Sequence, residues 1–243
     1  MGTDQNEGDN RAPSSRSTPD GESLSVPQGP HFERRWPVII TVLVVIVLLA
    51  MLPKAIRLMP MWVTYIMGAV VLSPMVVVGL TAARERWLRV ERTVTLLFVA
   101  VAVILLLANT ANLIHVMAYG PADITGLELL ASGVGGWVGN VLVFSLMYWQ
   151  MDRGGPEARV NHAGKRADWL FPQEGAPAGD VPTGWRPVFV DYLYLGYSTA
   201  TAFSTTDVPP LTARAKLLMM LESTLSLMMI VVVLARAINI LGS

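Results

Sequence analysis

Long apolar runs, separated by short polar clusters, dominate the chain from Trp36 onward. A membrane-spanning helix needs roughly 20 mostly apolar residues. Five segments fit that description, at residues 36–52, 59–82, 93–117, 127–151 and 212–241. Thr212 follows Pro209 and Pro210, so we expect it to be the N-cap of the last helix. The pattern predicts an all-α fold, a polytopic transmembrane helix bundle with about five spans.

Two stretches between the fourth and the last predicted helix break this pattern. Residues 152–186 are polar, contain Pro and Gly and have no sustained periodicity, so we interpret them as a loop. Residues 187–206 are apolar but are interrupted by Asp191, Gly196 and many hydroxyl groups. This second stretch is compatible with a re-entrant helix and loop, with a sixth span or with an interfacial helix.

The predicted organisation has four parts. Residues 1–30 are rich in Gly, Ser, Pro, Asp and Asn and have little to bury, so we expect a disordered polar tail. Residues 31–151 form a four-helix transmembrane region, and residues 152–186 form the polar loop. Residues 187–243 hold the re-entrant-like helix and the last transmembrane helix. The first apolar run starts only at Trp36, which favours a retained membrane helix over a cleaved signal peptide.

The amino-acid composition excludes several classes of function. Hydrophobic residues make up 53% of the chain and charged residues 15%, whereas soluble domains carry about 25% charged residues. The net charge is zero, with no basic patch, so nucleic acid is not an expected partner. There is no cysteine, which excludes disulfides, thiolate metal sites and cysteine nucleophiles. We find no phosphate-binding or nucleophile motif and no metal-ligand spacing, so we predict no enzyme activity, no cofactor and no metal.

Basic residues in the short loops predict the orientation in the membrane. They precede the first predicted helix, separate the second from the third and follow the fourth, while Lys54 and Arg57 are exceptions. We therefore expect a plasma (inner) membrane protein with a cytoplasmic N-terminus and a cytoplasmic loop at 152–186. The same charges favour a dip of residues 187–206 from the cytoplasm over a sixth crossing. Tyr148 and Trp149 suit an aromatic belt at the membrane interface.

Glu222 is the acidic residue inside the last predicted span, with Ser226 one turn later. An acidic side chain at the centre of a membrane helix costs about 3 kcal/mol, so Glu222 is expected to face protein or water. Its candidate partners are His115, Asn109 and Arg214. Such a carboxylate is a candidate functional group; the alternative is a position near the interface, where it would be solvated.

The third predicted span carries Asn109, Asn112 and His115 at spacings of three, which places them on one stripe of the helix. The simpler interpretation is hydrogen bonding to other helices, for example to Asn140. The other is a polar or proton-conducting path in which His115 titrates.

Gly135 and Gly139 form a Gly-x-x-x-Gly pair in the fourth predicted span. Small residues at this spacing let a second helix approach closely, so we predict helix packing within the chain or between subunits. A substrate path along this face is the alternative.

The stretch from Asp191 to Pro210 resembles the pore loop of a two-helix potassium-channel module. Thr199 and Thr201 match the threonines at the end of the pore helix, Asp207 matches the aspartate, and Pro210 matches the proline before the inner helix. The departures are at the filter itself, where Ser204 and Thr206 replace glycines and Thr205 replaces a tyrosine. A carbonyl-lined filter needs dihedrals that glycine adopts at low cost, so the resemblance does not imply potassium selectivity.

The second half of the chain also resembles a family of uncharacterised bacterial multi-pass membrane proteins. The matching parts are an Asp-aromatic-Leu-Tyr segment at 191–194, the Thr-rich turn at 199–207, Arg214 with Lys216, and the last helix. The Asp-Arg-Gly-Gly sequence that starts at Asp152 is similar as well. This resemblance implies a membrane location and a channel-like module, without a substrate.

Two functions follow as hypotheses. The first is a channel-like ion permeation protein, a homo-oligomer in the lipid bilayer that passes inorganic cations. Its constriction would be formed by residues 199–207 and its pore would include Glu222. The second is a non-transporting membrane scaffold or accessory subunit, suggested by the Gly135 and Gly139 face, the polar tail and the missing filter glycines.

Overall fold

The computed structural model describes residues 36–51, 57, 60–80, 85–119, 125–160, 166–177, 179–202 and 207–241. These residues are helical apart from turns, irregular segments and isolated bridge residues, which include an antiparallel bridge between Trp169 and Pro210. The longer helices are α1 (Trp36–Met51), α2 (Met61–Leu80), α3 (Glu85–Tyr119), α4 (Gly126–Met151), α6 (Phe189–Ala202) and α7 (Ala213–Leu241), and the short ones are η1 (Asp152–Gly154), α5 (Pro156–Val160) and η2 (Pro172–Gly175). The predicted all-α fold is confirmed for this part of the chain, whereas the N-terminal tail lies outside the described residues.

The helix boundaries agree closely with the hydrophobic pattern. Only α3 differs clearly, since it begins at Glu85 rather than near Thr93. The extra residues are mostly charged or long side chains with good helix propensity, so the helix extends beyond its apolar part. At α7, the hydroxyl oxygen of Thr212 accepts the N–H of Ala215 at 3.3 Å, which confirms the predicted N-cap.

Three segments of the described chain are long and apolar enough to cross a membrane, namely Arg92–Val116, Gly126–Gly154 and Ala213–Ala235. Helix α1 and the segment Trp62–Ser73 of α2 are apolar but shorter. These helices indicate a membrane location. Five spans stay a prediction.

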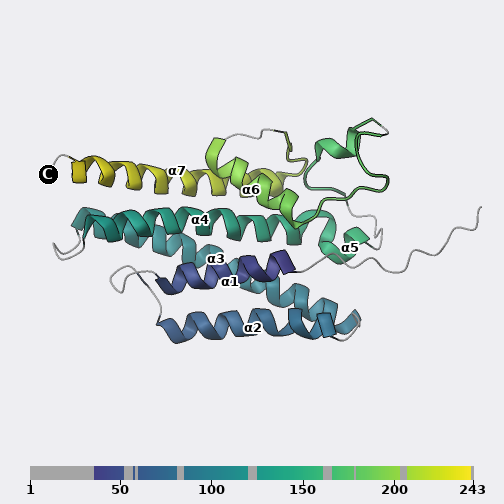
Figure 1. Cartoon of the computed structure of the whole chain (residues 1–243), viewed down its shortest axis with the longest axis horizontal. Coiled ribbons are helices and arrows are strands. Elements are labelled where there is room, and N and C mark those ends of the chain that lie inside the picture. The colour runs from purple at the N-terminus through teal and green to yellow at the C-terminus, as the bar shows by residue number, and fades with distance from the viewer. Residues whose placement is uncertain are drawn as a thin grey trace, which may run out of the picture. The chain divides into compact units, whose positions relative to one another are not determined.

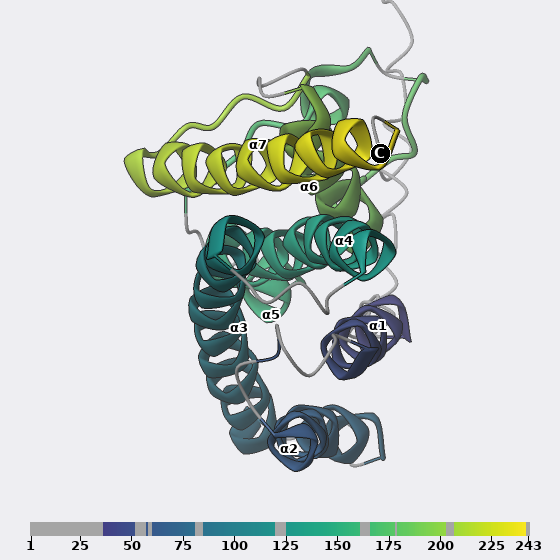
Figure 2. The same cartoon turned by 90° about the vertical axis from the view of Figure 1, so that its left-hand side faces the viewer.

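Helix α4 lies between two groups of helices (Figures 1 and 2). It packs against α6 and α7 on one side and against α1 and α3 on the other, while α2 packs against α1 and α3. The main apolar core follows α4 through these contacts. Its largest fully buried side chains include Phe144, Leu146, Tyr148, Trp149, Trp169 and Tyr192.

Helix α6 runs antiparallel to α4 and does not follow it to its far end (Figure 1). The Phe189 ring, at the start of α6, lies against Trp149 near the end of α4, and Gly196 lies beside Ser145. The chain then returns, because Pro210 is bridged to Trp169 in the loop that follows α4. Helices α6 and α7 thus both start at the C-terminal end of α4.

The length and the course of α6 bear on the alternatives for residues 187–206. At 1.5 Å per residue, a helix of 14 residues is about 21 Å long, whereas the hydrocarbon core of a bilayer is about 30 Å thick. Because α6 and α7 start at the same end of α4, and because one side of α6 is buried against α4 and α7, these residues favour a re-entrant helix. Its position in the membrane stays a prediction.

Close helix approach occurs at glycines other than the predicted pair. A Cβ atom on Gly68, Gly133 or Gly196 would lie 2.4–2.6 Å from a side-chain atom of a neighbouring helix. A Cβ atom on Gly135 would come no closer than 4.0 Å to Leu48, and on Gly139 it would meet nothing within 4 Å. Tight packing of Gly135 and Gly139 within the chain is therefore wrong, while packing between subunits stays a prediction.

Candidate functional site

The carboxyl group of Glu222 lies where α4, α6 and α7 meet. Glu222 is fully buried, and its Oε2 accepts a hydrogen bond of 2.5 Å from the hydroxyl of Tyr148 on α4. Asn140, two turns earlier on α4, donates from Nδ2 to the backbone oxygen of Glu222 at 3.1 Å. The other carboxyl oxygen, Oε1, is buried and accepts no hydrogen bond from the described residues. Oε1 is therefore an unused hydrogen-bond acceptor inside the helix bundle.

Gly196 of α6 brings a helix backbone close to this carboxyl group. An ideal Cβ atom on Gly196 would lie 2.5 Å from Ser145 Oγ, 3.2 Å from the Val141 oxygen and 3.3 Å from Glu222 Oε1. Ser145 already donates its hydroxyl hydrogen to the Val141 oxygen at 2.6 Å. Three oxygen atoms therefore surround one point beside Gly196, and no larger residue fits there without displacing them.

Two serines of α7 bind the last turn of α6. Ser226 is fully buried and donates to the Ala200 oxygen at 2.7 Å, and Ser223 donates to the Thr199 oxygen at 3.2 Å. The last carbonyl groups of a helix have no partner within the helix, so bonds from outside are needed when the end is buried. Residues 222–226 thus hold α6 in place at the level of Glu222.

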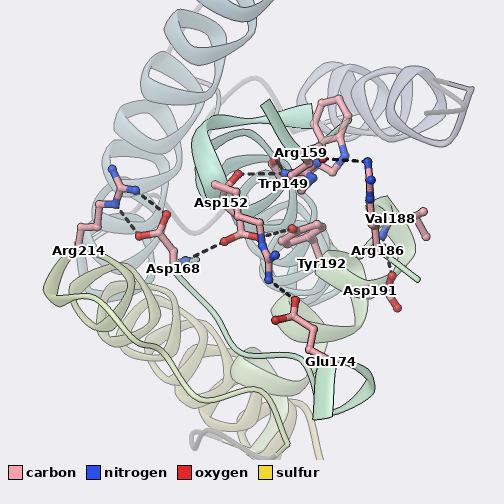
Figure 3. A network of polar contacts seen from close by, with 11 residues as sticks. Trp149, Asp152, Arg159, Asp168, Glu174, Arg186, Val188, Asp191, Tyr192 and Arg214 are labelled. Carbon is pink, nitrogen blue, oxygen red and sulfur yellow. Dashed lines mark hydrogen bonds and ion pairs between the residues drawn. The ribbon is translucent and has the colours of Figure 1, made fainter. Parts of the chain in front are cut away.

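A second polar network closes the end where α4 stops and where α6 and α7 start (Figure 3). Asp152 is fully buried, and its Oδ2 accepts the hydroxyl hydrogen of Tyr192 on α6 at 2.5 Å. Its Oδ1 accepts the backbone N–H of Asp168 at 2.8 Å. One carboxylate therefore ties α4 both to α6 and to the loop.

Asp168 continues the network to α7. Both of its carboxyl oxygens bind Arg214, at 2.6 Å from Nε and 2.6 Å from Nη2 (Figure 3). Its Oδ1 also accepts the Thr212 hydroxyl hydrogen at 2.6 Å. Such a bidentate pair fixes geometry as well as charge. The backbone adds two bonds, from Leu211 N to the Asp168 oxygen and from Leu170 N to the Pro209 oxygen.

Arg159 caps the C-terminal end of α4. Its Nη1 donates to the backbone oxygens of Trp149 at 2.7 Å and Asp152 at 3.2 Å, and its guanidinium lies 5.0 Å from the Tyr192 ring centroid (Figure 3). A cation at this end of a helix compensates the helix dipole and the free carbonyl groups. The predicted polar loop is therefore packed against the helix ends.

The chain reverses sharply after Asp152. Arg153, Gly154 and Gly155 have positive φ angles of 54°, 85° and 98°, which explains the two glycines. Arg153 forms an ion pair with Glu174. Burial raises the pKa of the Glu174 carboxyl, with an opposing effect from Arg153 and a further increase from Asp152.

The predicted constriction is only partly described. Thr199 is buried, and its hydroxyl donates to the Leu195 oxygen of its own helix at 2.8 Å. Thr201 is exposed and donates to the Tyr197 oxygen at 2.7 Å. Asp207 is exposed. The remaining three residues of the predicted constriction lie outside the described residues: Ser204, Thr205 and Thr206.

Of the predicted intramembrane polar residues, the structure brings Asn140, Glu222 and Ser226 together around the end of α6. The three residues of α3 lie elsewhere. His115 is exposed, with its ring against Tyr119 at 5.5 Å, and Asn112 is half-buried. The predicted Glu222 partners His115, Asn109 and Arg214 are wrong, since Tyr148 is the partner and Arg214 binds Asp168.

Asn109 lines a cavity of about 50 Å³ between α1, α3, α4 and α7. Its walls are mostly apolar and include Gly135, Gly136 and Gly139. The Asn109 Oδ1 is buried without a hydrogen bond from the described residues. Gly135 and Gly139, which were predicted to pack closely against another helix, thus line this cavity instead.

Sequence reasoning missed several of these residues. Tyr148 and Trp149 were expected at the membrane interface, but both are fully buried, 0% and 1% exposed, so this expectation is wrong. The spacing of Asn140 and Tyr148, eight residues or two turns, was the available signal that they share a helix face. Gly196, Asp152 and Tyr192 lie in segments that the sequence pattern singled out, but it did not indicate their contacts. Ser145, Arg159 and Asp168 had no such signal.

Among the described residues, no three His, Asp or Glu side chains lie together in a way that could hold a metal ion. The sequence matches no model of a protein family, and it is not significantly similar to any curated protein or solved structure. The resemblances to a potassium-channel module and to an uncharacterised membrane family stay predictions.

Proposed function

We propose that this protein is a multi-pass protein of the plasma (inner) membrane, with five spans and a re-entrant α6, that lets small cations cross. The spans would be α1, α2, α3, α4 and α7, which alternate in direction along the chain (Figure 1). One observation supports the channel-like part above all. A short helix enters the bundle, passes the buried carboxyl group of Glu222 at Gly196, and the chain then returns to the same end.

Charge supports the orientation. Arg153, Arg159 and Arg214 belong to the network at the C-terminal end of α4, and basic residues near membrane helices favour the cytoplasm. This end is therefore assigned to the cytoplasm, together with the N-terminus. The re-entrant helix then enters from the cytoplasm and α7 ends outside. Lys54 and Arg57, in the connection from α1 to α2, are exceptions.

The orientation is testable because the chain contains no cysteine. Asp207→Cys, an exposed position in the returning segment, is expected to react with a membrane-impermeant maleimide only from the cytoplasmic side. Arg57→Cys is the matched control and is expected to react only from outside. Labelling of both cysteines from the same side would contradict the orientation and the re-entrant helix.

Cation permeation is testable with purified protein in liposomes. The expected result is flux of at least one cation in a panel of H⁺, Na⁺, K⁺ and Mg²⁺, altered by Asp207→Ala and by Glu222→Gln. Glu128→Gln is the control, since Glu128 is exposed and binds Thr125 in a capping box that glutamine also forms. Absence of flux for every cation in protein that elutes as a single folded species would refute the function.

The second candidate is a non-transporting scaffold or accessory subunit. It is favoured by the side of α6 that faces outward, where Val190, Tyr194 and Tyr197 are 58%, 53% and 52% exposed. Spacings of four and three residues place them on one stripe, as in a helix that contacts another protein. Efficient crosslinking of Tyr194→Cys to a different membrane protein, without cation flux, would support this candidate.

A further inference from the structure

The bond between Tyr148 and Glu222 joins two side chains that have no contact with solvent. Both residues are 0% exposed, and the hydroxyl of Tyr148 lies 2.5 Å from Glu222 Oε2. The phenol occupies only one of the two carboxyl oxygens. Oε1 remains buried without a donor from the described residues, and a buried polar atom of this kind normally has a partner.

The contacts of Glu222 in the described chain include no positive charge. Arg214, two turns earlier on α7, is bound through two nitrogens to Asp168. From α4, Tyr148 and Asn140 donate hydrogen bonds to Glu222, and both side chains are neutral. An unpaired carboxylate in a low-dielectric environment is unfavourable by several kcal/mol, so the group must bind either a proton or a cation.

Several other titratable groups on the elements that pack against α7 contact residues other than Glu222. On α6, Tyr192 donates to Asp152, and Asp191 accepts the N–H of Val188 at 2.7 Å. On α3, the ring of His115 lies against Tyr119. In the part of the chain that the structure describes, the titratable side chain that binds the Glu222 carboxyl is Tyr148.

The ligands available around Oε1 favour a proton over a metal cation. A dehydrated metal cation needs a shell of several oxygen ligands. Among the described residues, Glu222 belongs to no group of three His, Asp or Glu side chains that could hold a metal ion. A hydrogen atom on Oε1 requires no such shell.

We propose that Glu222 is the proton-binding site of this protein and that the cation it passes is the proton. The carboxylate takes up one proton on Oε1 to become a neutral carboxylic acid and later releases it. Tyr148 keeps its own hydrogen throughout and positions the carboxyl group by donating to Oε2. This inference rests on the proposed cation permeation and names the ion.

The test uses the full chain in liposomes that contain a pH-sensitive dye, with a potassium gradient and valinomycin to set the voltage. Sodium and magnesium fluxes are measured in parallel vesicles, and potassium flux in vesicles without valinomycin. Wild-type protein is expected to pass protons and none of the three metal cations. Glu222→Gln is expected to lower the proton flux about a hundredfold, which is typical for loss of a proton-transferring group. Glu128→Gln is expected to leave the flux unchanged.

Tyr148→Phe tests the positioning role. Loss of a hydrogen bond to the carboxyl group is expected to reduce proton flux about tenfold and to shift the pH of half-maximal flux by about one unit. A purely structural role of Tyr148 would lower the amount of folded protein and leave this pH unchanged.

The outcomes separate the two proposals. Flux of Na⁺, K⁺ or Mg²⁺ without proton flux overturns the proton assignment and leaves cation permeation intact, whereas no flux of any ion overturns both. Unchanged proton flux in folded Glu222→Gln also overturns the assignment. If Glu222→Gln does not fold, the wild-type protein is treated with a hydrophobic carbodiimide, which reacts with protonated carboxyl groups. A Glu222 adduct that declines with rising pH supports the proposal, and its absence at every pH contradicts it.

Discussion

Arg214 binds both carboxyl oxygens of Asp168, with two nitrogen–oxygen distances of 2.6 Å. The carboxylate is fully buried, whereas the arginine side chain is 55% exposed. This pair joins the loop after α4 to the first turn of α7. Together with the contacts of Asp152, it fixes where both α6 and α7 begin.

Arg214→Ala is expected to destabilise the protein by about 1–3 kcal/mol, because a hydrogen bond to a charged group is lost while Asp168 stays buried. Arg214→Lys is expected to lose less stability, because lysine keeps the positive charge but cannot form the bidentate pair. Thermal unfolding in detergent, followed by tryptophan fluorescence, measures the difference. Lys216→Ala, at an exposed position one turn away from Thr212, is the control. Equal midpoints for Arg214→Ala and wild type would contradict the role of the pair.

Gly196→Ala is expected to destabilise the protein by about 1–3 kcal/mol, because its methyl group would overlap Ser145 Oγ. The double variant with Ser145→Ala is expected to recover part of this loss, since the nearest atom is removed. Gly139→Ala is the matched control within the same bundle. It has nothing within 4 Å of its added carbon and is expected to be neutral or to stabilise α4 by up to about 1 kcal/mol.

Gly139→Ala also tests packing between subunits. If this glycine lies in a subunit interface, the variant is expected to change the oligomeric state, measured by light scattering in detergent. An unchanged oligomer together with unchanged stability would leave Gly139 as part of the cavity wall alone.

Ser226→Ala is expected to cost about 1 kcal/mol, because the buried Ala200 oxygen loses its partner at 2.7 Å. Ser223→Ala is expected to cost less, since its bond is longer, at 3.2 Å. Amide hydrogen exchange is expected to accelerate in the last turn of α6 in both variants and to stay unchanged in α1. Thr224→Ala is the control, because its hydroxyl binds the Met220 oxygen of its own helix. Equal exchange in Ser226→Ala and Thr224→Ala would show that the bond does not hold α6.

The raised pKa of Glu174 predicts a pH dependence of stability. Burial is its largest cause, and Arg153 opposes it. A carboxyl group whose pKa is higher in the folded state binds protons more tightly there. Its favourable contribution is present below the ordinary pKa of about 4.5 and is lost as the pH rises through the raised value. Wild type is therefore expected to lose stability relative to Glu174→Gln over this acid range. The unfolding midpoints of both proteins, measured in parallel from pH 4 upward, test this expected loss of stability. A difference between the two midpoints that does not change with pH would contradict it.

The hydrophobic pattern was enough to place the long helices, because burial of an apolar segment and helix formation both follow from local composition. It predicted α4 and α7 to within about one residue at each end. Thr212 was recognisable as an N-cap, because capping depends on neighbours in the sequence. Glu222 was also recognisable from its neighbours in the sequence, because it is an acidic residue within an apolar segment.

Only the tertiary structure decided what these residues contact. The partner of Glu222 is Tyr148, 74 positions away in the sequence, and the partner of Asp168 is Arg214, 46 positions away. Such pairs depend on how helices cross, which a local pattern does not encode. The return of the chain after α6 could not be predicted for the same reason. A short apolar segment has the same local sequence pattern whether it crosses the membrane or only dips into it. The sequence by itself determined a helical membrane protein, and the tertiary packing of α4, α6 and α7 decided where its buried carboxyl group lies.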